Sequence, residues 1–413
     1  MWLILIVILI FFSVPFLLFY TKFGLLPVVK KRGKALPIIV PRVDGFKVET
    51  TWIGNQICGD LYIPTRMDNT PSKGYPLVIM AQGLNLTRRN FLPFVAVQLM
   101  KAMEYNIVIL AFDYRHFGDS KGSPRQHISP KEQLDDWLYV IEYMRNKESD
   151  LIDKEKLCLY IKFSKDCERI TITNICDVID ITSFYKKKKK KGSGQYIGNK
   201  VYEQRENRKP VYREDLCAFA SKTFSSRYGV KCVIANMPLI NFPTAKSFKE
   251  NTRLAILGWG ALVDWILAKL SNNAINLYAQ WYADTNDGSK FPFHFFEEVG
   301  FTAKDFETLH SQTESEQEWK NGFTLRSLYE ISSYFRNASQ INDLICVENI
   351  NIPVLYFVAK DDKCCPPNTT LLAKTKCQQT VVYNGSHHAI YQSEHFDNMC
   401  SHIAKFLEQH LLI

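Results

Sequence analysis

Apolar and polar positions alternate along most of the chain in a pattern typical of buried strands separated by amphipathic helices. Short, nearly continuous apolar runs indicate strands covered on both faces, and segments with apolar residues at helical spacing fall between them. The pattern predicts two β stretches within 40–63, strands at 75–83, 106–115, 156–160, 230–240 and 351–362, a last strand and loop at 380–391, and helices at 91–103, 130–146 and 396–412. Repeated strand-helix-strand units imply an α/β fold with a mostly parallel, doubly wound sheet and helices on both faces.

An uncharged run from Trp2 to Tyr20 precedes this pattern. About 20 apolar residues cross a bilayer as a helix, so we expect a transmembrane anchor in residues 1–25 and a linker in residues 26–44. A cleaved signal peptide is the alternative, but the run lacks a basic segment before it and a small-residue cleavage site. Lys and Arg follow the run, and the positive-inside tendency then predicts a single-pass membrane protein with its main domain in the cytosol.

Two long segments depart from the strand and helix pattern. Residues 161–214 have no regular periodicity and include six consecutive lysines, Lys186 to Lys191, which predicts a disordered insertion. Residues 243–345 are largely helical in pattern and rich in tryptophan, as expected of a helical cap region. The α/β domain therefore extends over residues 45–413 and contains both segments.

The positive charge of the chain is local. The formal net charge is +9, but residues 22–34 carry +5 and residues 161–214 carry +7, which leaves the remainder at −3. A mildly acidic body argues against nucleic acid as a partner. The eleven cysteines are an odd number without regular pairing, which indicates a reducing compartment. Their spacing does not match a zinc site, so no metal is predicted.

Several motifs in a fixed order carry a resemblance to a known family. They are LYIPTR, LVIMAQGLN, VILAFDYRHFGDSKGSPRQHISPKEQLDDW, KCVIANMPLI, EWKNGFTLRS, VLYFVAKDDKCCPP and NGSHHAIY. The chain resembles serine hydrolases of the α/β-hydrolase superfamily, in the branch of dienelactone hydrolases, esterases, thioesterases and serine aminopeptidases. The resemblance implies the α/β-hydrolase fold, no metal or organic cofactor, and acyl transfer to water from a small ester or thioester. The aromatic-rich cap region favours a substrate with an apolar acyl group.

The resemblance also implies an acid and a base. Acyl transfer needs a nucleophile, a base that takes its proton and an acid that orients the base, and in this fold they follow the order serine, aspartate, histidine. Asp362 follows a predicted strand four residues before Pro366 and is expected to be the acid, with the adjacent Asp361 as the alternative. His387 follows Gly-Ser after the last strand and is expected to be the base, with His388 as the alternative.

Donors for the oxyanion are expected in the loop after the strand at 75–83. The resemblance assigns them to the backbone amides of Gly83 and Leu84. Gln82 stands where the family usually has a histidine before the glycine. This difference need not remove the oxyanion hole, because the donors are backbone groups.

The nucleophile is not identified. The family carries Gly-x-Ser-x-Gly directly after the strand represented here by residues 157–160, because the serine stands in a strained strand-to-helix turn with small flanking residues. Here the chain continues with Ile-Lys-Phe-Ser, and no glycine occurs between Gly122 and Gly192. Ser164 therefore lacks the small neighbours that this turn requires.

A literal Gly-x-Ser-x-Gly match occurs earlier, at residues 118–122 with Ser120 at its centre. In the family this segment is the loop after the preceding strand, and Asp113 and Arg115 are expected to hold that loop in place. We therefore interpret Ser120 as a chance match.

The segment 161–214 has two explanations. It stands where the nucleophile turn belongs, so the simplest hypothesis is a mis-predicted or unspliced transcript. The rival is a real isoform that has lost catalysis. Three functions remain open at this stage: hydrolysis of an ester or thioester, hydrolysis of a peptide by the same fold, and binding by a membrane-tethered protein built on an inactive hydrolase.

Overall fold

The structure is a computed structural model, and it describes most of the α/β pattern. The described residues are 44–65, 71–83, 86–147, 150–162, 228–237, 252–271, 276–279, 322–338, 352–362, 367, 378–387, 389–391 and 393–412. The predicted anchor at 1–25, the linker up to residue 43 and residues 163–214 of the predicted insertion lie outside this set. Among the helices that are described, none is long and apolar enough to cross a bilayer.

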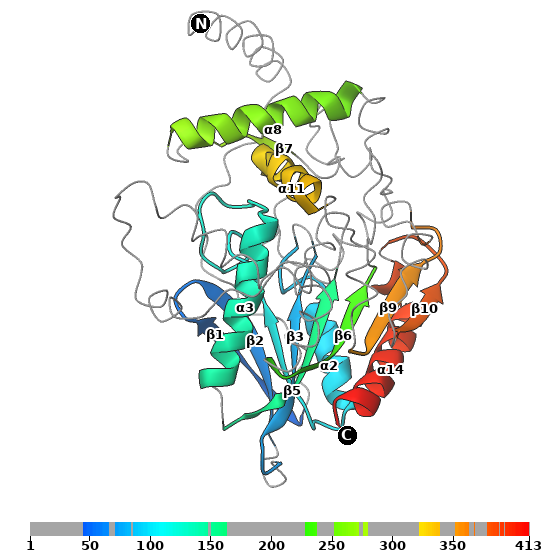
Figure 1. Ribbon diagram of the computed structural model, residues 1–413. Coiled ribbons are helices and arrows are strands. Elements are labelled where there is room, and N and C mark those ends of the chain that lie inside the picture. The colour runs from blue at the N-terminus through cyan, green and yellow to red at the C-terminus, as the bar shows by residue number, and fades with distance from the viewer. Residues whose placement is uncertain are drawn as a thin grey trace, which may run out of the picture.

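The predicted sheet is present among the described residues. Its strands are β1 (Phe46–Ile53), β2 (Ile57–Pro64), β3 (Tyr75–Ala81), β4 (Val108–Phe112), β5 (Ile152–Lys162), β6 (Val230–Asn236), β9 (Val354–Ala359) and β10 (Gln378–Tyr383). Their spatial order is β1-β2-β4-β3-β5-β6-β9-β10 (Figure 1). β2 is antiparallel to both β1 and β4, and the pairings from β4 to β10 are all parallel. The prediction of a mostly parallel sheet is confirmed.

The central strands are apolar because helices cover both faces of the sheet. Every residue of β3 is buried, as expected of a strand without a solvent face. β5 is longer than the apolar run at 156–160, because Ile152 already pairs with Tyr75 before a shift in register. The strands predicted at 106–115 and 351–362 are shorter than expected, because their polar ends belong to loops at the edge of the sheet.

The order of the strands fixes the side on which each helix lies. α2 (Leu92–Ala102) connects β3 to β4, and α3 (Pro130–Lys147) connects β4 back across β3 to β5. The two connections run in opposite directions, so right-handed crossovers place their helices on opposite faces. α14 (Ser393–His410) ends the described chain and packs against α2. The helices predicted at 91–103, 130–146 and 396–412 are thus confirmed.

Two further helices lie beyond the carboxyl ends of the parallel strands (Figure 1). They are α8 (Thr252–Leu270) and α11 (Leu325–Ala338), which pack against each other, and beside them β7 (Tyr278–Ala279) pairs with β8 (Phe323–Thr324). The buried carboxylate of Asp264 on α8 joins these elements, because it accepts hydrogen bonds from the amides of Leu277 at 2.7 Å and Arg326 at 2.8 Å. We call α8, β7, β8 and α11 the cap elements. The role of segment 243–345 as a cap over the site stays a prediction.

The cap elements are attached to the loop that precedes α3. The amide of Thr324 donates to the carbonyl oxygen of Gln126 at 3.0 Å, and the amide of Ile128 donates to Oγ of Ser327 at 2.8 Å. The hydroxyl of Tyr278 donates to the carbonyl oxygen of Arg125 at 3.3 Å. Bonds from several backbone positions hold this end of the cap elements at a fixed place relative to the sheet.

A buried imidazole of the same loop is paired with a partly exposed carboxylate of α3. His116 Nε2 lies 2.8 Å from Glu132 of α3, and its Nδ1 lies 2.8 Å from the carbonyl oxygen of Pro124. A carboxylate and a carbonyl only accept hydrogen bonds, so these two contacts favour the protonated ring. Burial acts in the opposite direction and outweighs them, so the pKa of His116 is lower than its ordinary value. Burial also opposes the charge on Glu132, but the hydrogen bond from His116 outweighs it and lowers the pKa of Glu132 to about 2.

This pair predicts an acid-dependent loss of stability. The pKa of Glu132 is lower in the folded state than its ordinary value of 4.5, so its contribution is present above pH 4.5 and disappears as the pH falls toward 2. Glu132→Gln is expected to lower the free energy of unfolding at pH 7 by about 1 kcal/mol, because solvent screens the partly exposed carboxylate. The same substitution is expected to have no effect near pH 2. Urea unfolding at several pH values measures this. The control is Glu155→Gln, at an exposed ion pair with Arg145, and an equal pH dependence in both variants would contradict the prediction.

Candidate active site

The two residues predicted as base and acid are in contact. His387 lies in the loop after β10 and Asp362 directly follows β9, so parallel neighbouring strands bring both to the same edge of the sheet. Nδ1 of His387 lies 2.7 Å from Oδ2 of Asp362, and both side chains are almost completely buried. Because a carboxylate accepts, Nδ1 is the donor, and in the neutral ring Nε2 then carries the lone pair. This tautomer suits a general base.

Asp361 has a different place in the structure. Its carboxylate accepts a hydrogen bond from the amide of Gly385 at 3.2 Å, and its own amide donates to the carbonyl oxygen of Gly385 at 3.1 Å. Gly385 adopts a φ of 111°, and a Cβ there would approach Ala389 to 2.7 Å. Asp361 thus holds the turn that precedes His387, and Asp362 rather than Asp361 contacts the ring. His388 lies outside the described residues.

A buried polar network lies beside this pair and joins three strand ends. The side-chain amide of Asn236, the last residue of β6, donates to the hydroxyl of Tyr391 at 3.0 Å and to the hydroxyl of Tyr160 of β5 at 3.1 Å. Tyr391 follows the His387 loop, and its ring stacks on Phe91 with centroids 4.1 Å apart. Phe91 ends the loop after β3. The network therefore fixes the His387 loop relative to the ends of β5 and β6 and to the loop after β3.

Removing one hydroxyl of this network predicts a measurable loss of stability. Tyr391→Phe leaves the amide of Asn236 with one acceptor fewer in a buried site, so we expect the free energy of unfolding to fall by about 1–2 kcal/mol. Chemical denaturation measures the change. The matched control is Tyr143→Phe, whose exposed hydroxyl lies 3.3 Å from the carbonyl oxygen of Trp52, and this variant is expected to change stability by less than about 0.5 kcal/mol. Equal losses in the two variants would argue against the network.

The loop after β3 holds the predicted oxyanion donors. The amide of Gly83 lies 3.4 Å from Oε1 of Gln82, and Leu84 lies outside the described residues. The Gln82 side chain is buried, and its Nε2 donates across the loop to the carbonyl oxygen of Asn90. Asn90 in turn accepts from the amide and hydroxyl of Thr87 at 2.7 and 3.0 Å. Gln82, in the place of the expected histidine, therefore joins the two ends of this loop.

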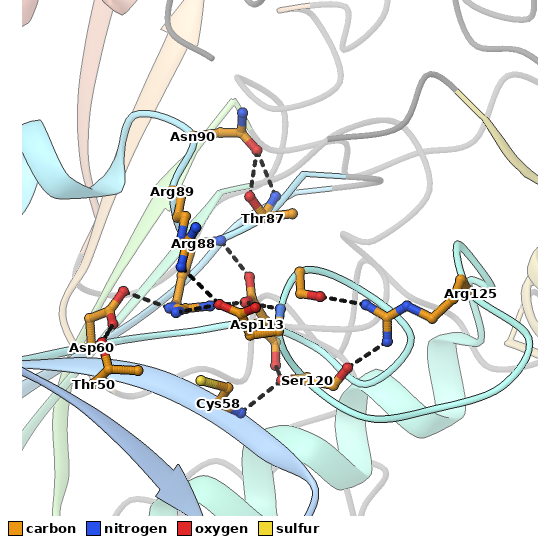
Figure 2. Close-up of polar contacts among 12 residues, drawn as sticks. Thr50, Cys58, Asp60, Thr87, Arg88, Arg89, Asn90, Asp113, Ser120 and Arg125 are labelled. Carbon is orange, nitrogen blue, oxygen red and sulfur yellow. Dashed lines mark hydrogen bonds and ion pairs between the residues drawn. The ribbon is translucent and has the colours of Figure 1, made fainter. Parts of the chain in front are cut away.

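A buried arginine anchors the same loop to the sheet (Figure 2). Nε of Arg88 donates to Asp60 of β2 at 2.6 Å, Nη1 contacts Asp113, and Nη2 donates to Asp119 at 2.9 Å. The backbone amide of Arg88 also donates to Asp113 at 2.7 Å. Burial by itself lowers the pKa of Arg88, but the carboxylates of Asp113 and Asp60 outweigh it and hold this pKa well above its ordinary value. The guanidinium thus ties the loop after β3 to β2 and to the loop after β4.

Sequence reasoning missed Arg88. It expected Asp113 and Arg115 to hold the loop after β4, and both do make such contacts. Asp113 accepts from the amide of Asp119 at 3.0 Å, and the guanidinium of Arg115 donates to Asp136 of α3 at 2.6 Å. The available signal for Arg88 was Asp60, a carboxylate inside the otherwise apolar strand ICGDLYIP, because a buried charge requires a partner.

Comparisons with known proteins decide the fold. No family model matches the chain. The α/β hydrolase GrgF from Penicillium sp. sh18 superimposes with a TM-score of 0.56 at 16% identity, over 89% of this chain and 99% of that one. A soluble variant of monoglyceride lipase from Saccharomyces cerevisiae, in complex with a substrate analogue, gives 0.52 at 11% identity, over 91% of this chain and 98% of that one. This chain has the α/β-hydrolase fold.

Curated relatives match a shorter stretch of the chain. The quorum-quenching protein AidA of Acinetobacter baumannii is 39% identical over 100 residues, which are 24% of this chain and 30% of that protein. The thiohydrolase aneE of Aspergillus aculeatus is 32% identical over 85 residues, which are 21% of this chain and 25% of that protein. The matches thus span about a quarter to a third of these relatives. The α/β-hydrolase fold that the resemblance implied is confirmed.

Within the α/β-hydrolase fold, Ser120 is remote from the histidine. Its side chain is fully buried, and its hydroxyl donates to the carbonyl oxygen of Asp113 at 2.6 Å and accepts from the amide of Cys58 at 2.8 Å. β4 and β9 are separated by β3, β5 and β6, which corresponds to about 19 Å at ~4.8 Å per strand. Ser120 therefore joins β2 to the loop after β4 and does not meet His387.

The position of a nucleophile in the α/β-hydrolase fold is the carboxyl end of β5. This strand lies between β3 and β6, and its last paired residue, Lys162, is opposite Asn236. A group that directly follows β5 would lie between the loop of Gly83 and the pair of Asp362 and His387. Residues from 163 onward, including Ser164, lie outside the described part of the chain. The sequence itself has no Gly-x-Ser-x-Gly directly after Tyr160.

Three of the described cysteines, Cys58, Cys158 and Cys400, do not supply an alternative nucleophile. Burial raises the pKa of the Cys58 thiol to about 12 and that of Cys400 to about 12. Burial also raises the pKa of Cys158 well above its ordinary value. A thiol attacks as the thiolate, so these three groups are inert near neutral pH. No cluster of metal-binding side chains occurs among the described residues.

Proposed function

We propose that the active form of this protein hydrolyses an ester or thioester with an apolar acyl group by transfer of the acyl group to water. The observation that carries the proposal is the 2.7 Å hydrogen bond between buried His387 and Asp362 at the carboxyl edge of the sheet. A histidine fixed in one tautomer by a buried carboxylate is the base of a nucleophile, histidine and acid triad. The names of two curated relatives, a thiohydrolase and an acyltransferase, support acyl transfer as the type of reaction.

The proposed mechanism assigns each group one step. A serine directly after β5 loses its proton to Nε2 of His387 and attacks the acyl carbon, and His387 then gives this proton to the leaving group. Asp362 holds the ring and stabilises the imidazolium that forms. The amides of Gly83 and Leu84 donate hydrogen bonds to the oxyanion. Water completes the reaction when it attacks the acyl-serine with His387 again as the base.

The test begins with the native transcript across the codons for Lys156 to Val233. The proposal predicts a message shorter than one that would encode the present sequence, with Gly-x-Ser-x-Gly encoded directly after Tyr160. The protein made from this message is expected to hydrolyse a medium-chain p-nitrophenyl ester or thioester. If the message encodes residues 161–214 as written, the proposed serine does not exist and the mechanism is refuted.

A second function is favoured by the sequence after β5. The chain as written has no small-flanked serine there, and Ser120 is buried with its hydroxyl engaged in two hydrogen bonds. In this alternative the chain is a tethered binding protein on an inactive hydrolase fold. It predicts that the purified chain neither reacts with a fluorophosphonate nor turns over esters, and labelling of this chain at Ser120 or Ser164 would refute it.

The location is a further part of the proposal. The apolar run from Trp2 to Tyr20 and the +5 charge of residues 22–34 support a single-pass anchor with the hydrolase domain in the cytosol. The sequence offers a reporter, because Asn337 begins an Asn-x-Ser sequon. A cytosolic domain predicts that Asn337 carries no glycan in cells, and a glycan there would place the domain on the other side of the membrane.

A further inference from the structure

Helix α8 places its small residues inside and its large apolar residues outside. Gly260, Ala261, Asp264 and Ala268 are buried, and they recur at helical spacing along one face. Among the described elements, α8 packs against α11. The ring of Trp265 packs at a tilt against that of Tyr329 of α11, with ring centroids 5.0 Å apart. The contact with the rest of the protein is thus made by small side chains, one carboxylate and the ring of Trp265.

The opposite face of α8 is an apolar stripe. Leu262, Ile266 and Leu270 are spaced by four residues and so form one row along the helix. Leu262 and Ile266 are partly exposed, and Leu270 is 79% exposed. A surface helix of a soluble protein normally presents its polar face to water and its apolar face to the core. α8 instead presents large apolar side chains to water at the described part of its surface.

Charge on α8 is confined to the ends and to the inner face. Between Arg253 and Lys269 the sequence has one charged residue, Asp264. Its carboxylate faces inward, since it accepts hydrogen bonds from the amides of Leu277 and Arg326. Lys269 is exposed beside Leu270 at the end of the stripe. An apolar stripe with a cation at its end and no outward acid matches the chemistry of a phospholipid interface.

The position of α8 also fits a membrane surface. Figure 1 shows α8 as the described element farthest from the sheet, beyond α11 and at the carboxyl end of the parallel strands. The pair of Asp362 and His387 lies at this same edge. The chain also carries the apolar run from Trp2 to Tyr20, which predicts an anchor and would keep the domain close to a bilayer.

We infer that the stripe of Leu262, Ile266 and Leu270 docks on the surface of a phospholipid bilayer. The stripe lies at the level of the acyl chains next to the headgroups, and Lys269 contacts the phosphate groups. Docking at this end brings the site close to apolar acyl compounds dissolved in the membrane. That these compounds are the substrates rests on the proposed function. The docking itself requires no catalysis.

Photochemical cross-linking tests the inference on the full-length chain. A benzoylphenylalanine is introduced in place of Leu270, and the purified chain is reconstituted with vesicles of phosphatidylcholine and phosphatidylserine. The matched control carries the same group in place of Phe94, an apolar residue of α2 that is 42% exposed. After irradiation, mass spectrometry is expected to find severalfold more phospholipid adduct at position 270 than at position 94.

Each other result overturns the inference. A cross-link from position 270 to a second copy of the chain assigns the stripe to a dimer, and a cross-link within the chain assigns it to internal packing. Equal lipid adducts at positions 270 and 94 show non-specific contact. Reactivity with a fluorophosphonate is measured on the same samples, so that failure of the docking and failure of the proposed hydrolysis are separate observations.

Discussion

Replacement of His387 by alanine is expected to lower kcat for a medium-chain p-nitrophenyl ester by about 10⁴-fold or more in the form that carries the nucleophile. Without the imidazole, the serine has no base at neutral pH and the leaving group has no proton donor. A buried hydrogen bond of 2.7 Å to Asp362 holds the imidazole of His387 in one position. The variant therefore loses a base with a fixed position. Steady-state kinetics with wild type and variant at equal folded concentration measures the effect.

The neighbouring residues provide matched controls for this prediction. His388→Ala is expected to retain most of the turnover, because the residue hydrogen-bonded to Asp362 is His387. Asp362→Asn is expected to lower kcat by about 10⁴-fold, since an amide stabilises the wrong tautomer. Asp361→Asn changes a group that contacts Gly385 and is expected to have a much smaller effect on kcat. Full activity of the His387→Ala variant, or loss of activity only in His388→Ala, would contradict the assignment of the base.

Replacement of Arg88 by methionine is expected to lower the free energy of unfolding by about 3–5 kcal/mol. Methionine fills most of the volume but leaves the buried carboxylates of Asp60 and Asp113 without the guanidinium that compensates them. An uncompensated buried charge lowers the free energy of unfolding far more than the loss of one ion pair at the surface. Denaturant unfolding followed by circular dichroism measures the change.

A surface ion pair is the control for Arg88. Lys47 lies 2.7 Å from Glu49, and both side chains are about half exposed. Lys47→Met is expected to change stability by less than about 1 kcal/mol. A second variant tests the cause, because Arg88→Met combined with Asp60→Asn and Asp113→Asn removes the uncompensated charges and should recover part of the loss. If Arg88→Met and Lys47→Met have equal effects, the ion pairs of Arg88 do not stabilise the loop after β3.

The sheet could be predicted from the sequence because its strands are buried on both faces. The run YPLVIMA of β3 and the run VLYFVA of β9 contain no charged residue, so their pattern identifies a parallel sheet without further information. Strand ends were less predictable. β5 begins at Ile152, within a segment that contains Asp153 and Lys154, because pairing with β3 continues beyond the apolar run.

The candidate site was predictable only in part. Asp362 and His387 follow strand ends in a recognisable order, so the sequence indicated both of them. Arg88 was not recognised, because its meaning depends on carboxylates that are 28 and 25 positions away in the sequence. The motif around Ser120 was interpreted as a chance match from the sequence, and in the structure its flanking glycines shape the loop after β4. At Gly118 an added Cβ would meet the carboxylate of Asp113.

In the proposed mechanism, a serine at the carboxyl end of β5 acts with His387. The most direct test is to treat the protein isolated from its native cells with a fluorophosphonate and to map the modified residue by mass spectrometry. The expected result is a modified serine at the centre of a Gly-x-Ser-x-Gly motif that directly follows the sequence Leu-Cys-Leu-Tyr of residues 157–160. Absence of modification, or modification of Ser120, would contradict it.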